Sequence, residues 1–228
     1  MPRRPRNYLP GYTYHLVQRG VNRAATFFNH EDYLSYLTLW EYYSQKFGLG
    51  VHAYCLMANH IHFLVTPTTA DSISFTTRLV GSRYANRVNK KYSRTGTLWE
   101  GRHWASLIDD ESYLLRCYRY IELNPVRANT CLSPAEYQWS SYRLNTDTSK
   151  SWLTPHPIFQ RLGKSAEERG TNYSAFVSQG CPEEELNTFT KGFRKNRPTA
   201  NVRIIKNLEL KHQIDLGKEK CGRPWPEK

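Results

Sequence analysis

The chain has no long apolar run. None of its apolar stretches approaches the roughly 20 residues that a membrane-spanning helix needs. The segment from Met1 to Arg6 carries charge but lacks the apolar stretch of a secretory signal. The five cysteines are widely spaced and form no Cys-x-x-Cys pair, which argues against a zinc knuckle and against a disulfide framework. These absences favour a protein of the reducing cytoplasm.

Acidic residues are few relative to basic ones. The 228 residues include 32 Lys+Arg and 20 Asp+Glu, which gives a formal net charge of +12. A surplus of this size is typical of a protein with a polyanionic partner, and without a membrane segment we favour nucleic acid. Aromatic residues make up 14% of the chain. Some of them could stack on unpaired bases beside Lys and Arg, although most will be core residues.

Hydrophobic periodicity predicts alternating strands and helices over the first 124 residues. In chain order these are a strand at 12–20, a helix from 29 or 30 to 47, strands at 51–57 and 60–66, a helix at 72–92, a strand at 98–108 and a helix from 109 to 123 or 124. The last helix should end there because a proline follows at position 125. This order predicts an α+β fold with a ferredoxin-like split βαβ antiparallel sheet and one extra C-terminal helix.

The character of the sequence changes near residue 146. Residues 131–145 resemble a packed return segment, 146–150 a polar linker, and 151–190 two or three short helices. From Lys191 onward there are eleven Lys/Arg against four acids. We therefore expect a main domain at 1–145 and an accessory, mostly helical, basic region at 146–228.

His60 and His62 flank one apolar residue within a predicted strand. Side chains alternate faces along a strand, so both imidazoles should lie on the same face, with Ile61 in the core. Two neighbouring imidazoles can form half of a divalent-metal site. The alternative is a pair of structural histidines with no metal.

Tyr120 and Asn124 are four residues apart on the last predicted helix and should share one face. A carboxamide oxygen can serve as a third metal ligand, and a phenol beside a metal-bound phosphate can act as a nucleophile. The alternative is that Tyr120 is a core aromatic residue and Asn124 caps the helix before Pro125.

Three ordered segments, 58–65 (ANHIHFLV), 96–102 (GTLWEGR) and 119–128 (RYIELNPVRA), carry a family resemblance. Together they are similar to the single-tyrosine HUH transposases, in particular the REP-associated tyrosine transposase branch of the insertion-sequence transposase-like family. Residues 12–23 also resemble the opening strand of that family. The resemblance covers about residues 8–145 and does not extend to the accessory region.

The resemblance implies a role for each motif residue. His60 and His62 would be the metal ligands, Tyr120 the nucleophile, and Mg²⁺ or Mn²⁺ the cofactor. Asn124 would be the third ligand. At this position many relatives carry Gln, which is one methylene longer, so this chain departs from the family pattern here. Tyr113 and Tyr118 are rival nucleophiles on the same helix, of which Tyr118 should face away from Tyr120.

The implied reaction is cleavage and rejoining of single-stranded DNA at imperfect, REP-like hairpins through a 5′-phosphotyrosine. The enzyme would act as a monomer or a homodimer in the bacterial cytoplasm, associated with the nucleoid. A rival hypothesis is a domesticated hairpin-binding protein without turnover. A relaxase or replication initiator, or an RNA-binding ferredoxin-like module, is less consistent with the sequence.

Candidate DNA contacts come from four places, and Glu122 is expected to have no catalytic role. The basic stripe on the 72–92 helix could track phosphates or could be an ordinary solvated face. The candidates are Arg3, Arg4 and Arg6 in an N-terminal arm, Arg19, Asn22 and Arg23 after the first strand, Arg83, Arg87, Lys90 and Lys91 on the stripe, and Arg102.

Overall fold

Four strands form one antiparallel sheet in the computed structural model, which describes residues 6, 8–108, 111–147, 151–194 and 208–211. The strands are β1 (Thr13–Arg19), β2 (Leu49–Met57), β3 (His60–Pro67) and β4 (Trp104–Ile108), in the order β2-β3-β1-β4. With a helix after β1 and another after β3, this is the predicted α+β ferredoxin-like arrangement.

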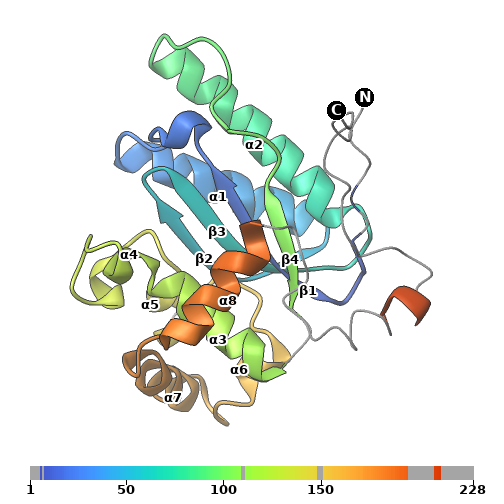
Figure 1. The fold of residues 1–228 in the computed structure, drawn as a ribbon, viewed down its shortest axis with the longest axis vertical. Helices are drawn as coiled ribbons and strands as arrows, with labels where there is room; N and C mark the ends of the chain where they lie inside the picture. Colours follow the sequence, from blue (N-terminus) through green and yellow to red (C-terminus); the bar gives the residue numbers. More distant parts are fainter. Residues whose placement is uncertain (1–5, 7, 109–110, 148–150, 195–207, 212–228) are drawn as a thin grey trace, which may run out of the picture.

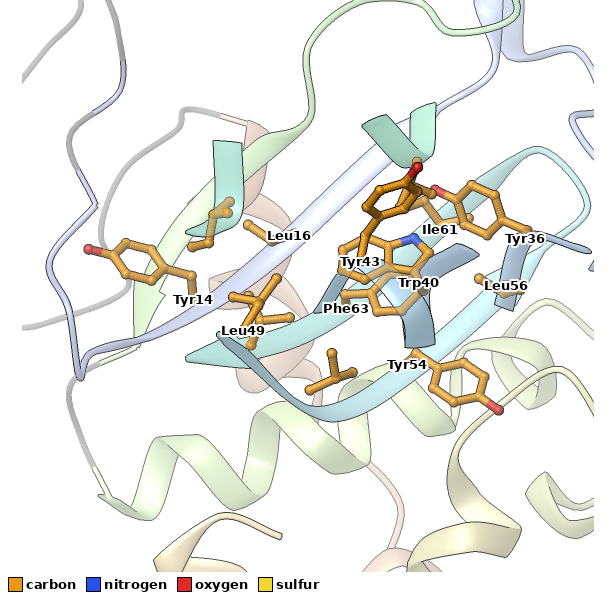
Figure 2. Close-up of a cluster of buried hydrophobic side chains, with 14 of the residues drawn as sticks. Tyr14, Leu16, Tyr36, Trp40, Tyr43, Leu49, Tyr54, Leu56, Ile61 and Phe63 are labelled. Carbon is orange, nitrogen blue, oxygen red and sulfur yellow. The ribbon is translucent and has the colours of Figure 1, made fainter. Parts of the chain in front are cut away.

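Helices α1 (His30–Lys46) and α2 (Ser72–Lys91) cover one face of the sheet (Figure 1). A capping box of Asn29 and Asp32 begins α1. The helix ends before Gly48, whose φ of 61° and close approach to Thr68 exclude a Cβ. Below α1 the ring of Trp40 stacks on Phe63 of β3 with centroids 3.7 Å apart, at the centre of a large aromatic core (Figure 2).

The other face of the sheet carries α3 (Glu111–Glu122), with α8 (Glu183–Arg194) beside it (Figure 1). Arg119 of α3 donates to Glu185 of α8 at 2.8 Å, and both side chains are largely buried. Because strand residues alternate, Ile61 packs toward α1 and α2, whereas His62 faces Tyr120 of α3. The histidine pair therefore lies between the sheet and the second helical layer.

One predicted boundary was wrong, and a second was off by one or two residues. The strand predicted at 98–108 begins only at Trp104, because the chain around Gly101 is irregular and makes just a single bridge, from Trp99 to Gly20. The helix before the proline ends at Glu122, and a short helix α4 (Asn124–Arg127) follows it directly. Pro125 lies in the first turn of α4, where a helix tolerates a missing N–H.

Shorter helices punctuate the rest of the described chain. They are η1 (Val21–Arg23), η2 (Pro134–Glu136), α5 (Tyr142–Thr146), α6 (Pro157–Gln160) and α7 (Ala166–Ser178). The expected domain boundary at 145/146 falls inside α5, and one hydrophobic cluster joins α3 to α6, α7 and α8. Most of the basic tail after Arg194 lies outside the described residues. None of the helices in the described ranges is long and apolar enough to span a bilayer.

Residues of two helices, α5 with its N-cap and α7, surround Glu122 at the end of α3. Its carboxylate accepts hydrogen bonds from Ser141 (2.5 Å), Asn145 (2.7 Å) and Tyr173 (2.6 Å). Burial outweighs these bonds and raises the pKa of Glu122 to about 7. Glu122 thus anchors α3 to α5 and α7.

Candidate active site

His60 and His62 share one face of β3, as the alternation of the strand predicts. Their ring centroids are 5.1 Å apart, with the planes at 79°. His60 Nδ1 donates to Asn59 Oδ1 at 2.7 Å. Burial lowers the pKa of His60 to about 4 and that of His62 well below its usual value. Both rings are therefore neutral at physiological pH, the form in which imidazole binds metals.

His15 of β1 lies directly against this pair. Its Nε2 is 2.9 Å from Nδ1 of His62, and the two rings stack at 5.1 Å. Antiparallel pairing of Val17 with His62 brings the two histidines onto one face as diagonal neighbours. His15 is fully buried, which lowers its pKa to about 3.

Tyr120 projects from α3 toward these rings. Its ring centroid is 5.9 Å from that of His62 and 5.8 Å from that of His15, both in edge contacts. The side chain is 5% exposed and His62 is 2% exposed. The structure therefore brings together the predicted nucleophile and the predicted ligands, from elements more than 50 residues apart in sequence.

Arg127 of α4 covers the ring of Tyr120. Its guanidinium carbon is 4.2 Å from the ring centroid, and its Nη1 donates to the Tyr120 carbonyl oxygen at 2.9 Å. This cation also contributes to the lowered pKa values of His15, His60 and His62. A positive charge held here suits an anionic group at the site, such as a phosphate.

Asn124 reaches the same place from the start of α4. A hydrogen bond between its side chain and the ring of His60 partly offsets the fall in the pKa of that ring. Asn124 Nδ2 is buried and has no hydrogen-bond partner among the residues that the structure describes. Since the two ends of a carboxamide are nearly isosteric, rotation would put the oxygen at this position, where a cation could satisfy it.

The candidate ligand set is two neutral imidazoles and one carboxamide. Within the described residues there is no group of three or more His, Cys, Asp or Glu side chains that could hold a metal. The predicted ligand set contains only two such residues, His60 and His62, because its third member is Asn124. Two nitrogen donors and one oxygen donor fit a divalent ion of intermediate hardness such as Mn²⁺, and suit Mg²⁺ less well.

The rival tyrosines occupy other positions. Tyr118 is fully buried and stacks on Phe159 at 5.6 Å, on the side of α3 that faces α6 and α7. Tyr113 packs on Phe189 of α8 at 4.7 Å. Tyr120 is the one of the three with a ring contact to His62 in the described part of the chain.

A residue of the accessory region covers Tyr120. The ring of Phe189 lies 4.7 Å from that of Tyr120 and 6.5 Å from that of His15, and it is fully buried. α8 contacts β1, β4 and α3. In this conformation the helix closes the site from one side.

Three of the predicted DNA-contact residues lie close to the histidines. Arg19 pairs with His60 across the sheet, and its guanidinium binds Glu100 at 2.6 Å and lies over Trp104. Asn22 and Arg23 follow in η1, both with positive φ, of 52° and 60°. Arg23 and His60 line the same pocket.

The basic residues of α2 are not brought to the site, because α2 covers the opposite face of the sheet (Figure 1). Lys91 binds Glu31 and Asp32 at 3.0 Å, so it holds α2 against α1. Arg83 lies over the ring of Tyr43. Arg87 and Lys90 are exposed on that helix.

Of the remaining candidates, Arg6 and Arg102 lie beside the start of β4, and Arg3 and Arg4 lie outside the described residues. Arg6 donates to the carbonyl oxygen of His103, and Arg102 is exposed next to that residue.

Two residues of the site were missed from the sequence, His15 and Arg127. His15 lies in the buried part of β1, so the hydrophobic pattern of the strand alone indicates a core residue at this position. Arg127 lies seven residues after Tyr120, which is two turns of a helix. In a helix that continued across Leu123, this spacing would have placed both side chains on one face and indicated Arg127 as a site residue.

The fold and these side chains define a ferredoxin-like domain in which paired strand histidines face a tyrosine on a following helix. Residues 9–124, slightly more than half of the chain, match the family model described as Transposase IS200 like. The chain therefore belongs to the IS200-like transposase family. No curated protein matches it significantly.

A solved structure shares its fold, and two others resemble it more weakly. The structure of a REP-associated tyrosine transposase bound to a REP hairpin matches with a TM-score of 0.56 and 16% identity, over 69% of this chain and 93% of that one. A protein of Deinococcus radiodurans R1, provisionally assigned as a transposase, matches with a TM-score of 0.37 and 17% identity, over 49% and 89%. A bacterial tRNA(His) guanylyltransferase-like protein with GTP reaches 0.34 and 14%, over 58% and 68%. The last two TM-scores are too low to establish a shared fold.

Proposed function

We propose that this chain is a metal-dependent single-stranded DNA endonuclease and strand transferase with Tyr120 as its nucleophile. The observation that carries the proposal is the edge contact between Tyr120 and His62 at 5.9 Å, with Arg127 over the phenol. This constellation combines a nucleophile, a fixed cation and two neutral imidazoles in one buried place. Each of these components suits attack on a phosphodiester.

His60, His62 and the Asn124 side chain would hold the divalent ion. When bound, the ion would polarise the scissile phosphate and offset charge in the transition state. The neutral state of the two histidines, imposed by burial, is what makes them available as ligands. Arg127 would hold a second side of the same phosphate.

The chemical step is a transesterification. Tyr120 Oη attacks phosphorus and loses its proton, the bond from phosphorus to the 3′ oxygen breaks, and that oxygen leaves as a 3′-hydroxyl after gaining a proton. The product is a 5′-phosphotyrosine. Attack by a 3′-hydroxyl on this ester reverses the step and rejoins DNA, so no nucleotide triphosphate is needed.

The substrate in this proposal is single-stranded DNA that forms REP-like imperfect hairpins. The net charge of +12 and the positions of Arg19 and Arg23 beside His60 support an anionic strand at this edge of the sheet. The fold shared with a transposase whose structure contains a REP hairpin supports the same choice.

The test is adduct formation on a hairpin oligonucleotide labelled at its 3′ end, with Mn²⁺ present. The full chain should acquire the label covalently, and Tyr120→Phe should bind the DNA without acquiring it. Tyr118→Phe is the matched control, because that ring packs away from the site and should leave the adduct unchanged. A labelled Tyr120→Phe protein would refute the assignment.

A second candidate is a hairpin-binding protein without turnover. The burial of Tyr120 under Phe189 favours it, since a covered nucleophile cannot reach a phosphate. If the second candidate is right, tight hairpin binding will be accompanied by no adduct with either Mg²⁺ or Mn²⁺.

A further inference from the structure

Arg19, at the end of β1, lies beside the proposed ligand His60 on the same face of the sheet. The two residues are paired directly across β1 and β3. Side chains in such a pair start about 4.5–5.5 Å apart. A group bound to Arg19 would therefore lie next to whatever His60 binds.

Glu100 holds the guanidinium of Arg19 through both of its carboxylate oxygens. Arg19 Nε donates to Glu100 Oε2 at 2.6 Å, and Arg19 Nη2 donates to Glu100 Oε1 at 3.0 Å. The ring of Trp104 on β4 also contacts the group, with its centroid 5.4 Å from the guanidinium carbon. Two parallel hydrogen bonds and an aromatic ring fix the plane of the cation as well as its position.

The loop that carries Glu100 is itself fixed to the end of β1. The Glu100 N–H donates to the carbonyl oxygen of Arg19 at 2.9 Å, and Trp99 forms a β-bridge with Gly20. The buried ring of Trp99 donates through Nε1 to the Gly81 carbonyl oxygen at 3.2 Å. None of these bonds uses the carboxylate, so the loop should keep its fold when the charge of Glu100 is removed.

The outer edge of the guanidinium, between Nη1 and Nη2, remains available. Its two parallel N–H groups have no acceptor among the residues that the structure describes, and the side chains of Arg19 and Glu100 are 30% and 41% exposed. A surface ion pair contributes little to stability, so stability is a weak reason for this arrangement. An ordered guanidinium with one free edge is suited to bind a phosphate through two hydrogen bonds.

We propose that Arg19 binds the phosphate next to the one that Tyr120 attacks, and that Glu100 is the positioning residue of Arg19. The carboxylate orders the guanidinium before DNA arrives, so this long side chain loses less freedom during binding. The assignment rests on the proposed function, which places the scissile phosphate at the histidines. Successive phosphates along a strand are separated by a distance similar to that between paired side chains, so the next phosphate falls at Arg19.

Glu100 makes the direction of the expected effect diagnostic. Removing an acid beside a bound phosphate raises the local positive charge, which by itself should strengthen DNA binding. Removing a positioning residue should weaken binding instead, because Arg19 must then become ordered as DNA binds. Arg19→Lys should resemble Glu100→Ala, since lysine keeps the charge but has no planar fork.

The test uses DNA with single uncharged phosphates, bound to the Tyr120→Phe protein so that no covalent capture occurs. The probe is a DNA hairpin with a single-stranded flank selected from a randomised pool, resynthesised with one methylphosphonate at each position in turn. Fluorescence anisotropy should show a severalfold loss of affinity at the phosphate next to the cleavage position mapped with wild-type protein. Arg19→Ala should abolish this loss. Glu100→Ala should reduce it and weaken binding of unmodified DNA by about two- to tenfold.

The exposed pair of Arg161 and Glu111 provides the matched control. It has the same two-bond geometry, with N···O distances of 2.7 and 3.2 Å, and lies at the opposite end of α3 from Tyr120. Glu111→Ala removes the same charge as Glu100→Ala. It should leave the affinity for unmodified DNA and the effect of every methylphosphonate unchanged. Thermal unfolding of each variant checks that it is folded.

The outcomes separate this inference from the proposed function. If Glu100→Ala binds as tightly as Glu111→Ala and keeps the full methylphosphonate effect, the positioning role is overturned. If wild-type protein forms the adduct but Arg19 couples to no phosphate, or only to one remote from the cleavage position, the phosphate site is overturned and the proposed reaction stands. Coupling of Arg19 and Glu100 to one phosphate, with no adduct in wild-type protein, would support the phosphate site and refute the proposed reaction.

Discussion

His15 Nε2 lies 2.9 Å from His62 Nδ1, between two neighbouring strands. The proton between them can belong to either ring. If it belongs to His62 Nδ1, the Nε2 atom of His62 keeps its lone pair and can bind a metal; if it belongs to His15, that lone pair is lost. Burial keeps His15 neutral, so its Nε2 can accept a hydrogen bond from Nδ1–H of His62. His15 is thus a positioning residue for the proposed ligand.

We predict that His15→Phe weakens Mn²⁺ binding by about 10- to 100-fold, the usual cost of losing an outer-shell partner of a ligating histidine. The loss should appear in a titration followed by the electron paramagnetic resonance of free Mn²⁺, without any DNA. His15→Gln should retain much of the affinity because its amide oxygen can still accept. Equal affinity in the Phe variant and the parent would show that His15 is only a core residue.

Asn124 should contribute directly to metal binding. Asn124→Ala is expected to lower Mn²⁺ affinity by at least about tenfold, because one of three proposed protein donors is lost. Asn124→Asp should bind Mg²⁺ better than the parent does, since a carboxylate is the harder ligand. Calorimetric titration with each ion measures both effects. If the Ala variant binds Mn²⁺ like the parent, Asn124 is a structural residue and not a ligand.

Removal of Phe189 should uncover Tyr120. Phe189→Ala is expected to increase the rate of adduct formation severalfold, while stability falls by about 3–5 kcal/mol through loss of a buried ring. Phe176→Ala is the matched control, because Phe176 packs under Arg119 and lies in the same region without touching Tyr120. Labelled adduct formed at several times, with urea unfolding of each variant, gives both quantities. A slower rate in the Phe189 variant would mean that the ring supports the nucleophile.

Glu122 should make stability depend on pH. Its pKa rises from 4.5 to about 7 in the folded chain, so the folded state holds this proton more tightly than the unfolded state does. That contribution is fully present below about pH 4.5 and is lost as the pH rises toward 7, a change on the order of 3 kcal/mol. Glu122→Gln should remove this part of the slope.

Urea unfolding of the parent and of Glu122→Gln across this pH range measures the free energy of unfolding of each. The buried histidines contribute with the opposite sign in both proteins, so their contribution cancels in the difference. Glu167→Gln, at an exposed position, should leave the slope of the parent unchanged. The same slope in parent and Glu122→Gln would place the pH dependence elsewhere.

The sheet and its two covering helices were predictable because their signals are local. Alternation along β1 and β3 and helical spacing along α1 and α2 each depend on neighbours within a few residues. β4 was predicted too long, since a run of strand-forming residues around Trp99 does not reveal where its pairing partner, β1, ends. The break at Glu122 was also predicted approximately, from Pro125 alone.

By itself, the sequence determined which residues share a face: His60 with His62 through the strand period, and Tyr120 with the following turn through the helix period. Only the tertiary structure decided which faces meet. The pairing of β1 with β3 brings His15 to His62, the packing of α3 on the sheet brings Tyr120 to both, and α8 places Phe189 over the phenol. These contacts join residues up to 174 positions apart, as the ring contact of His15 with Phe189 illustrates. No local period records such pairings, because they depend on how whole surfaces pack together.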